Sequence, residues 1–426
     1  MKVLIMTFGT RGDVQPFVAL ARELRGRGHE PVLAAPRRFA GLAAEHGVAL
    51  APVDDGPLRS MDAARGDGGA MSGGLRARLA LARSMPAAFA RIFDDATAIA
   101  TTGPGAGAGV VVHNGQIMAA PHLAELLGVP AVLALTLPMY VPTREFPWPG
   151  LSLPVGLPGV LNRASFRGMK APEVMFGRVV DRWREQALGL ARRRGRHDPL
   201  RTPQGRPAPV LNAVSRHVVR PPADWPPSVT TTGYWFLPAA TDLPAELAAF
   251  LAAGEPPVLV GFGSMAGPDP AGTAAVVLAA VAGLGVRAIL ATGWGGLRPD
   301  RLPEGVIAVE QVPHDLLLPH VAAVVHHGGA GTTGAAAAAG RPQVICPFVA
   351  DQPFWGRRMH DLGVAPPPVP QRRLSAERLA AALRLALSDT AVGAAATELG
   401  HRIREEDGVG AAVTQLERLV PDGASR

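Results

Sequence analysis

One stretch, residues 321–354, limits the fold of this chain more than any other. Its pattern predicts four elements in a row: a buried strand over 322–326, a glycine-rich turn over 328–331, a helix opening at Thr332, and a strand over 343–348. A strand, a tight turn and a helix in this order begin a parallel βαβ unit. The sequence therefore predicts an α/β fold with a parallel sheet.

The turn itself has the features of an anion-binding site. Glycine lets the backbone approach a ligand closely, and Thr332 and Thr333 can cap the helix. The free N–H groups and positive dipole end of that helix then bind phosphate. One alternative is a plain strand–helix crossover. Another is a dinucleotide site, because Gly329, Gly331 and Gly334 satisfy G-x-G-x-x-G. That fingerprint normally occupies the first turn of its domain, whereas this one follows at least two earlier strands.

Two segments, HHGGAGTT (326–333) and ADQPFWG (350–356), resemble the donor-binding signature of UDP-sugar-dependent glycosyltransferases with the GT-B fold. Within that family the chain resembles the sterol and antibiotic-aglycone glucosyltransferases. The resemblance implies two facing Rossmann-like domains with a deep cleft between them. It also implies inverting transfer of a hexose, first of all glucose from UDP-glucose, to a hydroxyl of a sterol, a polyketide or another lipophilic natural-product aglycone.

The resemblance assigns donor-binding roles by position. The residues implied are Gly12, Ser264, Gln311, Val312, His327, Gly329, Gly331, Thr332, Thr333, Asp351 and Gln352. His327 would contact the diphosphate, while Asp351 and Gln352 would bind sugar hydroxyls, because a carboxylate accepts hydrogen bonds and a carboxamide both donates and accepts them. The alternative for Asp351 is a helix N-cap. His326 is expected to be structural, because neighbouring strand residues point to opposite faces.

The N-terminus predicts a second strand–turn–helix unit, with a strand over 3–8, a turn over 9–12 and a helix from near Pro16. Asp13 follows this first strand, where open α/β sheets place ligands. In the resembling family this loop faces the donor, which implies that Asp13 is the catalytic base. Its alternative role is the N-cap of the helix near Pro16. An ordinary aspartate is a weak base, so burial or a hydrogen-bond partner is expected to tune its pKa.

Acceptor-binding residues are expected in the first half of the chain. His113 and Asn114 end a predicted strand over 110–113 and could contact the acceptor. A proline-rich segment then carries six aromatic residues: Tyr140, Phe146, Trp148, Phe166, Phe176 and Trp183. Its T-R-x-x-P sequence resembles an acceptor-half segment of the sterol glucosyltransferases. We predict an acceptor wall that includes Tyr140, Phe146 and Trp148, with packing against the segment's own helices as the alternative.

Strand and helix patterns alternate along the 426 residues, which predicts two doubly wound domains. The expected parts are an N-terminal acceptor-binding Rossmann-like domain (1–218), a proline-rich linker (219–240), a C-terminal nucleotide-sugar-binding Rossmann-like domain (241–403) and a helix crossing back to the first domain (404–426). The strand over 210–215 is expected to be the last of the first domain. Residues 54–74, rich in Gly, Asp and Ala, are expected to form a surface loop.

Composition and charge indicate which kinds of partner the protein has. The net charge is +7, and the only lysines are Lys2 and Lys170. The preference for arginine, together with much Ala, Gly and Pro, indicates a GC-rich, bacterial genome. It does not point to a nucleic-acid partner, because no aromatic residues for base stacking lie among the basic residues at 192–196. That cluster is expected to be a solvated helix end, with contact to an anionic membrane surface as the alternative. The single cysteine, Cys346, excludes an intrachain disulfide.

The N-terminus lacks signal-peptide features, and no run of about twenty apolar residues predicts a membrane span. We therefore expect a cytoplasmic protein. The sequence has no Asp-x-Asp motif and no Cys/His ligand set, so we expect no metal and no cofactor, with the nucleotide sugar as co-substrate. The alternatives are a transferase that uses a TDP-deoxysugar, a nucleotide-sugar epimerase, an NAD-dependent oxidoreductase and a non-catalytic lipid- or sugar-binding protein.

Overall fold

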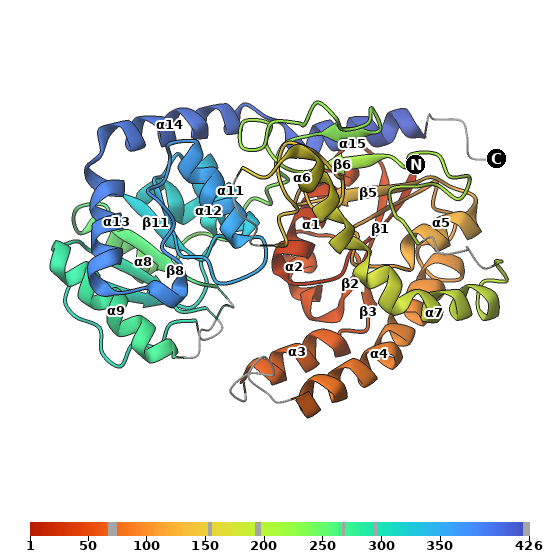
Figure 1. Ribbon diagram of the computed structural model, residues 1–426, viewed down its shortest axis with the longest axis horizontal. Coiled ribbons are helices and arrows are strands. Elements are labelled where there is room, and N and C mark those ends of the chain that lie inside the picture. Colours follow the sequence, from red (N-terminus) through yellow and green to blue (C-terminus); the bar gives the residue numbers. More distant parts are fainter. Residues whose placement is uncertain are drawn as a thin grey trace.

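The computed structural model describes residues 1–66, 75–151, 156–191, 197–263, 265, 269–293 and 296–420, and it contains two α/β domains side by side (Figure 1). The first sheet has the strand order β3-β2-β1-β4-β5-β6-β7, and the second has the order β10-β9-β8-β11-β12. Every strand pair in both sheets is parallel, with β4 at the centre of the first and β8 at the centre of the second.

The strands are short. Those of the first sheet are β1 (Lys2–Met6), β2 (Glu30–Pro36), β3 (Leu50–Val53), β4 (Val110–His113), β5 (Ala131–Leu135), β6 (Val210–Asn212) and β7 (Val229–Thr231). Those of the second sheet are β8 (Val258–Gly261), β9 (Ala288–Ala291), β10 (Val306–Val309), β11 (Ala323–His326) and β12 (Gln343–Ile345).

Helices flank both sheets. In the first domain they are α1 (Arg11–Gly26), η1 (Arg37–Phe39), α2 (Ala40–Glu45), α3 (Gly56–Gly66), α4 (Leu75–Thr101), α5 (Ala120–Leu127), α6 (Gly159–Ser165), η2 (Phe166–Lys170) and α7 (Ala171–Gln186). In the rest of the chain they are α8 (Ala245–Ala252), α9 (Pro270–Leu284), α10 (His314–Leu317), η3 (Leu318–His320), α11 (Ala330–Ala338), α12 (Gln352–Asp361), η4 (Gln371–Arg373), α13 (Ala376–Ser388), α14 (Thr390–Arg404) and α15 (Gly408–Leu419).

The inner strand β1 explains why the first sheet is covered on both faces. Successive side chains of a strand point to opposite faces, so an apolar run without polar interruptions needs two hydrophobic layers. Val3 and Ile5 belong to one buried cluster, whereas Leu4 and Met6 belong to another on the opposite face. The predicted doubly wound architecture is confirmed, and its strands end with their carboxyl ends along one edge.

Two predictions about elements are wrong. β7 lies inside the predicted linker and extends the first sheet past 210–215, because a run of only three β-branched residues is hidden among prolines. The expected loop at 54–74 contains α3, whose Gly56 N–H is accepted by the Asp54 carboxylate at 2.9 Å, while residues 67–74 lie outside the described residues. The helix expected over 404–426 is α15 and begins at Gly408, because Asp407 caps it by accepting the Gly410 N–H at 2.9 Å.

The C-terminal helices run from the second domain to the first along one side of the molecule (Figure 1). Three side chains of α15 are buried in the same core as β1 and α1: Ala412, Val413 and Leu416. Arg27 at the end of α1 donates to the Thr414 hydroxyl at 3.0 Å. The last helix is therefore packed into the first domain.

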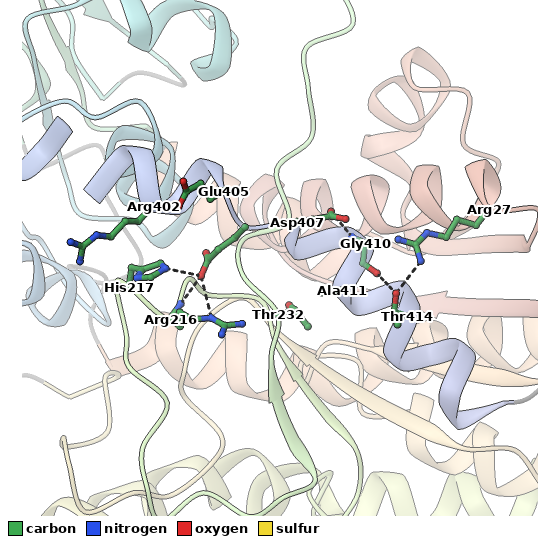
Figure 2. Close-up of a pocket in the computed structure, with 11 residues that line it drawn as sticks. Arg27, Arg216, His217, Thr232, Arg402, Glu405, Asp407, Gly410, Ala411 and Thr414 are labelled. Carbon is green, nitrogen blue, oxygen red and sulfur yellow. Dashed lines mark hydrogen bonds and ion pairs between the residues drawn. The ribbon is translucent and has the colours of Figure 1, made fainter. Parts of the chain in front are cut away.

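A polar pocket marks where the chain passes between the domains, and residues before β7 and at the α14–α15 break line it together (Figure 2). Glu406 accepts the backbone N–H of Arg216 at 3.2 Å, and His217 Nε2 lies 3.8 Å from the same carboxylate oxygen. Glu406 therefore holds the segment at residues 216–217 against the break between α14 and α15.

Candidate active site at the facing sheet ends

The two domains meet at the carboxyl ends of their central strands, the usual ligand position in open parallel sheets. Arg11, just after β1, donates to the Gln311 side-chain oxygen in the second domain at 2.9 Å. The Phe146 and Phe354 rings also meet across the domains, with their centroids 5.5 Å apart. Residues that follow β1, β5, β10 and β12 are thereby brought to one place.

Asp13 is the third residue of α1, which begins at Arg11 after the N-cap residue Thr10. The predicted N-cap role of Asp13, with a helix start near Pro16, is therefore wrong. The Asp13 Oδ2 atom accepts the Thr10 backbone N–H at 2.7 Å and the Thr10 hydroxyl at 2.9 Å. This is one half of a capping box, for which a Thr-x-x-Asp spacing is a recognisable sequence signal.

Gln116, which sequence reasoning missed, holds the other carboxylate oxygen. Its side-chain Nε2 donates to Asp13 Oδ1 at 2.6 Å from the loop after β4. Gly9 makes room for the pair: its φ of +136° favours glycine, and a Cβ there would overlap the Asp13 carboxylate and lie 2.7 Å from Gln116 Oε1. Oδ2 thus has two donors and Oδ1 has one, which leaves Oδ1 better able to accept a further hydrogen bond.

The environment raises the pKa of Asp13 above its ordinary value near 3.8. Burial is the largest cause, and the negative charge of Asp351 in the second domain acts in the same direction. Hydrogen bonds from Thr10 and Gln116 oppose the shift because they stabilise the ionised form. The carboxylate is therefore a stronger base than a solvent-exposed aspartate, as a catalytic base requires.

His113 and Asn114, at the end of β4, form their hydrogen bonds with neighbouring backbone groups. The Asn114 amide donates to the Phe8 carbonyl at 2.8 Å and accepts the Phe8 N–H at 3.3 Å, which ties the ends of β1 and β4 together. His113 is buried, its Nδ1 lies 3.0 Å from the Asn114 carbonyl, and burial lowers its pKa to about 4. Acceptor contact by either residue stays a prediction, while their position supports the loop that carries Gln116.

The six aromatic residues of the proline-rich segment separate into two groups. Phe166, Phe176 and Trp183 are buried in the domain core, whereas the three predicted wall residues, Tyr140, Phe146 and Trp148, are half-buried. The Tyr140 ring lies against Gly115, where any Cβ would overlap it. Burial raises the pKa of the Tyr140 phenol, and the charge of Asp13 adds to the increase, so the ring lies near the candidate base.

The glycine-rich turn leads into α11, which begins at Ala330 with Gly329 as its N-cap residue. The predicted start at Thr332 is therefore two residues late, and Thr333 lies one turn inside with a fully buried side chain. The Thr333 N–H bonds the Gly329 carbonyl at 2.9 Å. Within the described part of the chain, the N–H groups of Ala330, Gly331 and Thr332 form no such bond. These three donors point out of the helix start, where an anion can accept them.

The two histidines before the turn differ in their partners. His326 is buried, with Nε2 2.9 Å from the Gln343 side-chain oxygen and Nδ1 accepting the Gly328 N–H at 3.0 Å, so it shapes the turn as expected. His327 lies over the start of α11, since a Cβ on Gly329 would be 2.5 Å from its Nε2. Burial, with a smaller contribution from the charge of His314, lowers the pKa of His327 to about 4. It is therefore neutral near pH 7, and what it offers a diphosphate is a hydrogen bond and not a full charge.

In the segment after β12, a residue with a strained backbone directly precedes Asp351. Ala350 has φ of +57°, the one positive value among the non-glycine residues that the structure describes. Asp351 occupies the N-cap position of α12, but its carboxylate makes no cap bond and instead accepts the Trp355 indole N–H at 2.8 Å. Burial raises the pKa of Asp351. The Gln352 side-chain oxygen accepts the N–H of Phe348 at 2.8 Å, which leaves its amide N–H₂ group for a ligand.

The remaining predicted donor residues fall in different places. Gly12 is exposed beside Asp13, and Gln311 is exposed and bonded to Arg11, with Val312 half-buried next to it. Ser264 and the basic cluster at 192–196 lie outside the described residues. Nothing here tests the sugar or nucleotide contacts themselves, which stay predictions.

Two features of the described residues bear on other functions. No group of three or more His, Cys, Asp or Glu side chains in that part of the chain is arranged to hold a metal ion. No single helix in it is long and apolar enough to cross a membrane, although the bent pair Ala376–Ser388 and Thr390–Leu419 together reaches the required length and composition.

Comparison with known proteins identifies the family. Residues 3–145 match the glycosyltransferase family 28 N-terminal domain, and residues 275–414 match the erythromycin biosynthesis protein CIII-like C-terminal domain. A sterol 3-beta-glucosyltransferase of Arabidopsis thaliana is 34% identical over 439 residues, covering 99% of this chain and 68% of the plant protein. This chain belongs to the sterol 3-beta-glucosyltransferase family. It is a glycosyltransferase, which favours sugar transfer over the epimerase and oxidoreductase alternatives.

This glycosyltransferase spans only part of the length of its relatives and shares its fold with solved glycosyltransferase structures. A sterol 3-beta-glucosyltransferase of Penicillium rubens is 33% identical over 441 residues, which cover 98% of this chain and 30% of the fungal protein. This chain therefore spans about two thirds of the plant relative and under a third of the fungal one. The solved structure of the spinosyn forosaminyltransferase SpnP has a TM-score of 0.70 at 17% identity, over 99% of both chains. The predicted GT-B fold is confirmed, whereas the bacterial source stays a prediction.

Proposed function

We propose that this glycosyltransferase moves a hexose, first of all glucose from UDP-glucose, to a hydroxyl of a lipophilic acceptor such as a sterol, a polyketide or another natural-product aglycone. The observation that carries the proposal is that Asp13 and the α11 turn lie on facing sheet ends, which the 2.9 Å hydrogen bond from Arg11 to Gln311 of the second domain brings together. Family membership supports the reaction class, and the names of the relatives support a sterol-like acceptor.

The chemical step would run through Asp13. Its Oδ1 atom takes the proton of the acceptor hydroxyl as the acceptor oxygen forms a bond to the anomeric carbon. The bond from that carbon to the phosphate oxygen breaks, and the nucleoside diphosphate leaves with the electron pair. Attack from the face opposite the leaving group inverts the configuration. Gln116 and Thr10 keep the carboxylate in place, which is the positioning that such a step needs.

The leaving diphosphate gains negative charge, and the start of α11 supplies fixed donors for it. The N–H groups of Ala330, Gly331 and Thr332 and the positive end of the helix dipole are arranged before the reaction begins, which is the effective form of charge stabilisation. Neutral His327 adds one hydrogen bond. We propose on this basis that no metal and no cofactor beyond the nucleotide sugar takes part.

The acceptor would lie between Asp13 and the half-buried aromatics Tyr140, Phe146 and Trp148. The Trp148 indole nitrogen is buried without a hydrogen-bond partner among the described residues, so an acceptor oxygen that reaches it would supply the missing bond. Because the acceptor is lipophilic, we also propose that the protein makes peripheral contact with a membrane. We further propose a cytoplasmic location, which cell fractionation tests, and no nucleic-acid partner.

The deciding experiment incubates the purified protein with UDP-glucose and a panel of hydroxylated lipophilic acceptors, with UDP release and product mass as readouts. We expect acceptor-dependent UDP release. Asp13→Asn should lower kcat about 10³-fold while UDP binding persists, because it removes the base and keeps the size and shape of the side chain. Asp361→Asn, an exposed aspartate on α12, is the matched control and should retain full activity.

Other outcomes identify the alternatives. Release with TDP-deoxysugars but not with UDP-glucose would replace the donor in the proposal. Conversion of the nucleotide sugar without transfer would indicate an epimerase. Binding of acceptor and donor with no turnover, unchanged by Asp13→Asn, would refute the transferase and leave a binding protein.

A further inference from the structure

Exposed apolar side chains gather on one segment of the first domain. The helices α6, η2 and α7 follow one another without a gap. Within the described residues, five large exposed hydrophobic side chains belong to 151–175: Leu151, Val160, Leu161, Val174 and Met175. Val174 is 83% exposed, Met175 70% and Val160 69%, the three highest values for such side chains. Exposure of this degree at several neighbouring positions indicates a surface that meets a partner.

Helix geometry shows that α7 has a single outer face. At 3.6 residues per turn, six of its positions fall within an arc of about 100°. These positions are Ala171, Val174, Met175, Arg178, Arg182 and Glu185, and all six are exposed. The face is apolar in the first turns of the helix, and beyond them it carries two arginines and one acid, Glu185.

The inner side of α7 is fixed to the domain independently of that face. Phe176, Val180 and Trp183 are buried. Arg184, also buried, pairs with Glu125 of α5 at 2.9 Å. Substitutions on the outer face should therefore leave the helix in place.

Charge around the apolar residues indicates what the surface meets. Residues 156–186 carry five exposed cations, Arg163, Arg167, Lys170, Arg178 and Arg182, and one exposed acid, Glu185. Apolar side chains that enter the headgroup boundary, with cations beside anionic headgroups, are the pattern of interfacial membrane helices. A second copy of this chain fits less well, because a symmetric interface would set like charges against each other.

We infer that this surface, called here the α6–α7 face and made of Leu151, Val160, Leu161, Val174, Met175 and the five cations, docks the protein on an anionic lipid bilayer. The inference rests on the proposed lipophilic acceptor. The acceptor wall lies directly behind the face: the Trp148 backbone N–H donates to the Ser165 hydroxyl of α6 at 2.7 Å, and the Phe146 and Phe166 ring centroids are 6.3 Å apart. A membrane-dissolved acceptor would then reach the wall without crossing bulk water.

The test is co-sedimentation with phosphatidylcholine vesicles that contain or lack phosphatidylglycerol, at low and high salt. The wild type should pellet with the anionic vesicles and be released by salt. Val174→Asp with Met175→Asp should weaken binding at least tenfold, and Arg178→Gln and Arg182→Gln about fivefold each. The matched control is Leu385→Asp with Leu387→Asp on α13, which exposes the same kind of side chain in the other domain and should bind as wild type.

Glucosyl transfer to an acceptor dispersed in detergent is measured alongside, and Val174→Asp with Met175→Asp should leave it unchanged. If that transfer occurs but the wild type does not pellet, or if the α6–α7 and α13 variants bind equally, the docking inference fails and the proposed function stands. If the protein binds vesicles as expected but transfers glucose to no acceptor, the proposed function is refuted and the docking inference is supported. Sedimentation velocity that shows a dimer lost in the Val174→Asp, Met175→Asp variant, without vesicle binding, would assign the face to a second copy and overturn the inference.

Discussion

The turns after β1 and β11 are built alike and have opposite electrostatics. Each joins a buried parallel strand to a helix, and each helix has glycine as its second residue, Gly12 in α1 and Gly331 in α11. The third residue differs: Asp13 in α1 and Thr332 in α11. In α1 the carboxylate accepts the Thr10 N–H and occupies the positive end of the helix. In α11 no carboxylate does so, and the donors remain open to an anionic ligand.

The comparison shows how one backbone unit can serve two steps of one reaction. A carboxylate at a helix start is already stabilised by the helix, so the turn after β1 repels a second anion and keeps a base. A hydroxyl at the same position leaves the backbone donors free, so the turn after β11 attracts a diphosphate. One side chain thus distinguishes the catalytic turn from the binding turn.

The largest expected effect comes from making the second turn resemble the first. Thr332→Asp should weaken UDP binding about 100-fold, because a carboxylate within a few ångströms of the phosphates costs several kcal/mol at an effective dielectric of about 20. Isothermal titration with UDP measures the change. Thr332→Asn is the uncharged control of similar shape and should bind within a few-fold of wild type. Equal losses in both variants would mean that shape and not charge distinguishes the turns.

A smaller effect should follow from removing the residue that holds the first carboxylate. The transferase needs Asp13 ionised, so its activity is present above the pKa of that group and is lost as the pH falls through it. Gln116→Ala removes a donor to the ionised form and should raise that pKa further, moving the acidic limb of kcat/KM to higher pH and lowering kcat about tenfold. Gln116→Glu adds a negative charge and should move the limb further.

The pH profile distinguishes positioning from simple structural support. A residue that only supports the fold would lower the rate at every pH without moving the limb. An unmoved limb in both Gln116 variants would show that the 2.6 Å hydrogen bond does not tune the base, and the pKa of Asp13 would then be set by burial, Thr10 and Asp351.

Features contained in a short stretch of sequence could be predicted, whereas features that depend on distant residues could not. The α11 turn and the position of Asp13 could be predicted because each is contained in a short strand–turn–helix pattern. The helix starts were misplaced because Thr10 and Gly329, and not the residues first chosen, occupy the N-cap positions. β7 was missed because three residues are too few to show a period.

Long-range partners could not be predicted from one sequence. Gln116 is 103 residues from Asp13, and no spacing rule links an amide in one loop to a carboxylate in another. The need for glycine at position 9 follows from that pair, because only the assembled carboxylate and amide fill the space of a Cβ. The role of Arg11 depends on a domain arrangement that brings it to a residue 300 positions away.

The smallest expected effect concerns that contact between the turn after β1 and the second domain. Arg11 and Gln311 are both exposed, and exposed polar pairs contribute little because water competes for them. Arg11→Ala should raise KM for the nucleotide sugar about two- to threefold with kcat nearly unchanged. Arg22→Ala, an exposed arginine on the same helix, is the matched control. A double-mutant cycle with Gln311→Ala measures the coupling. Strictly additive effects would show that the two turns are brought together by domain packing alone and that this hydrogen bond does not contribute to donor binding.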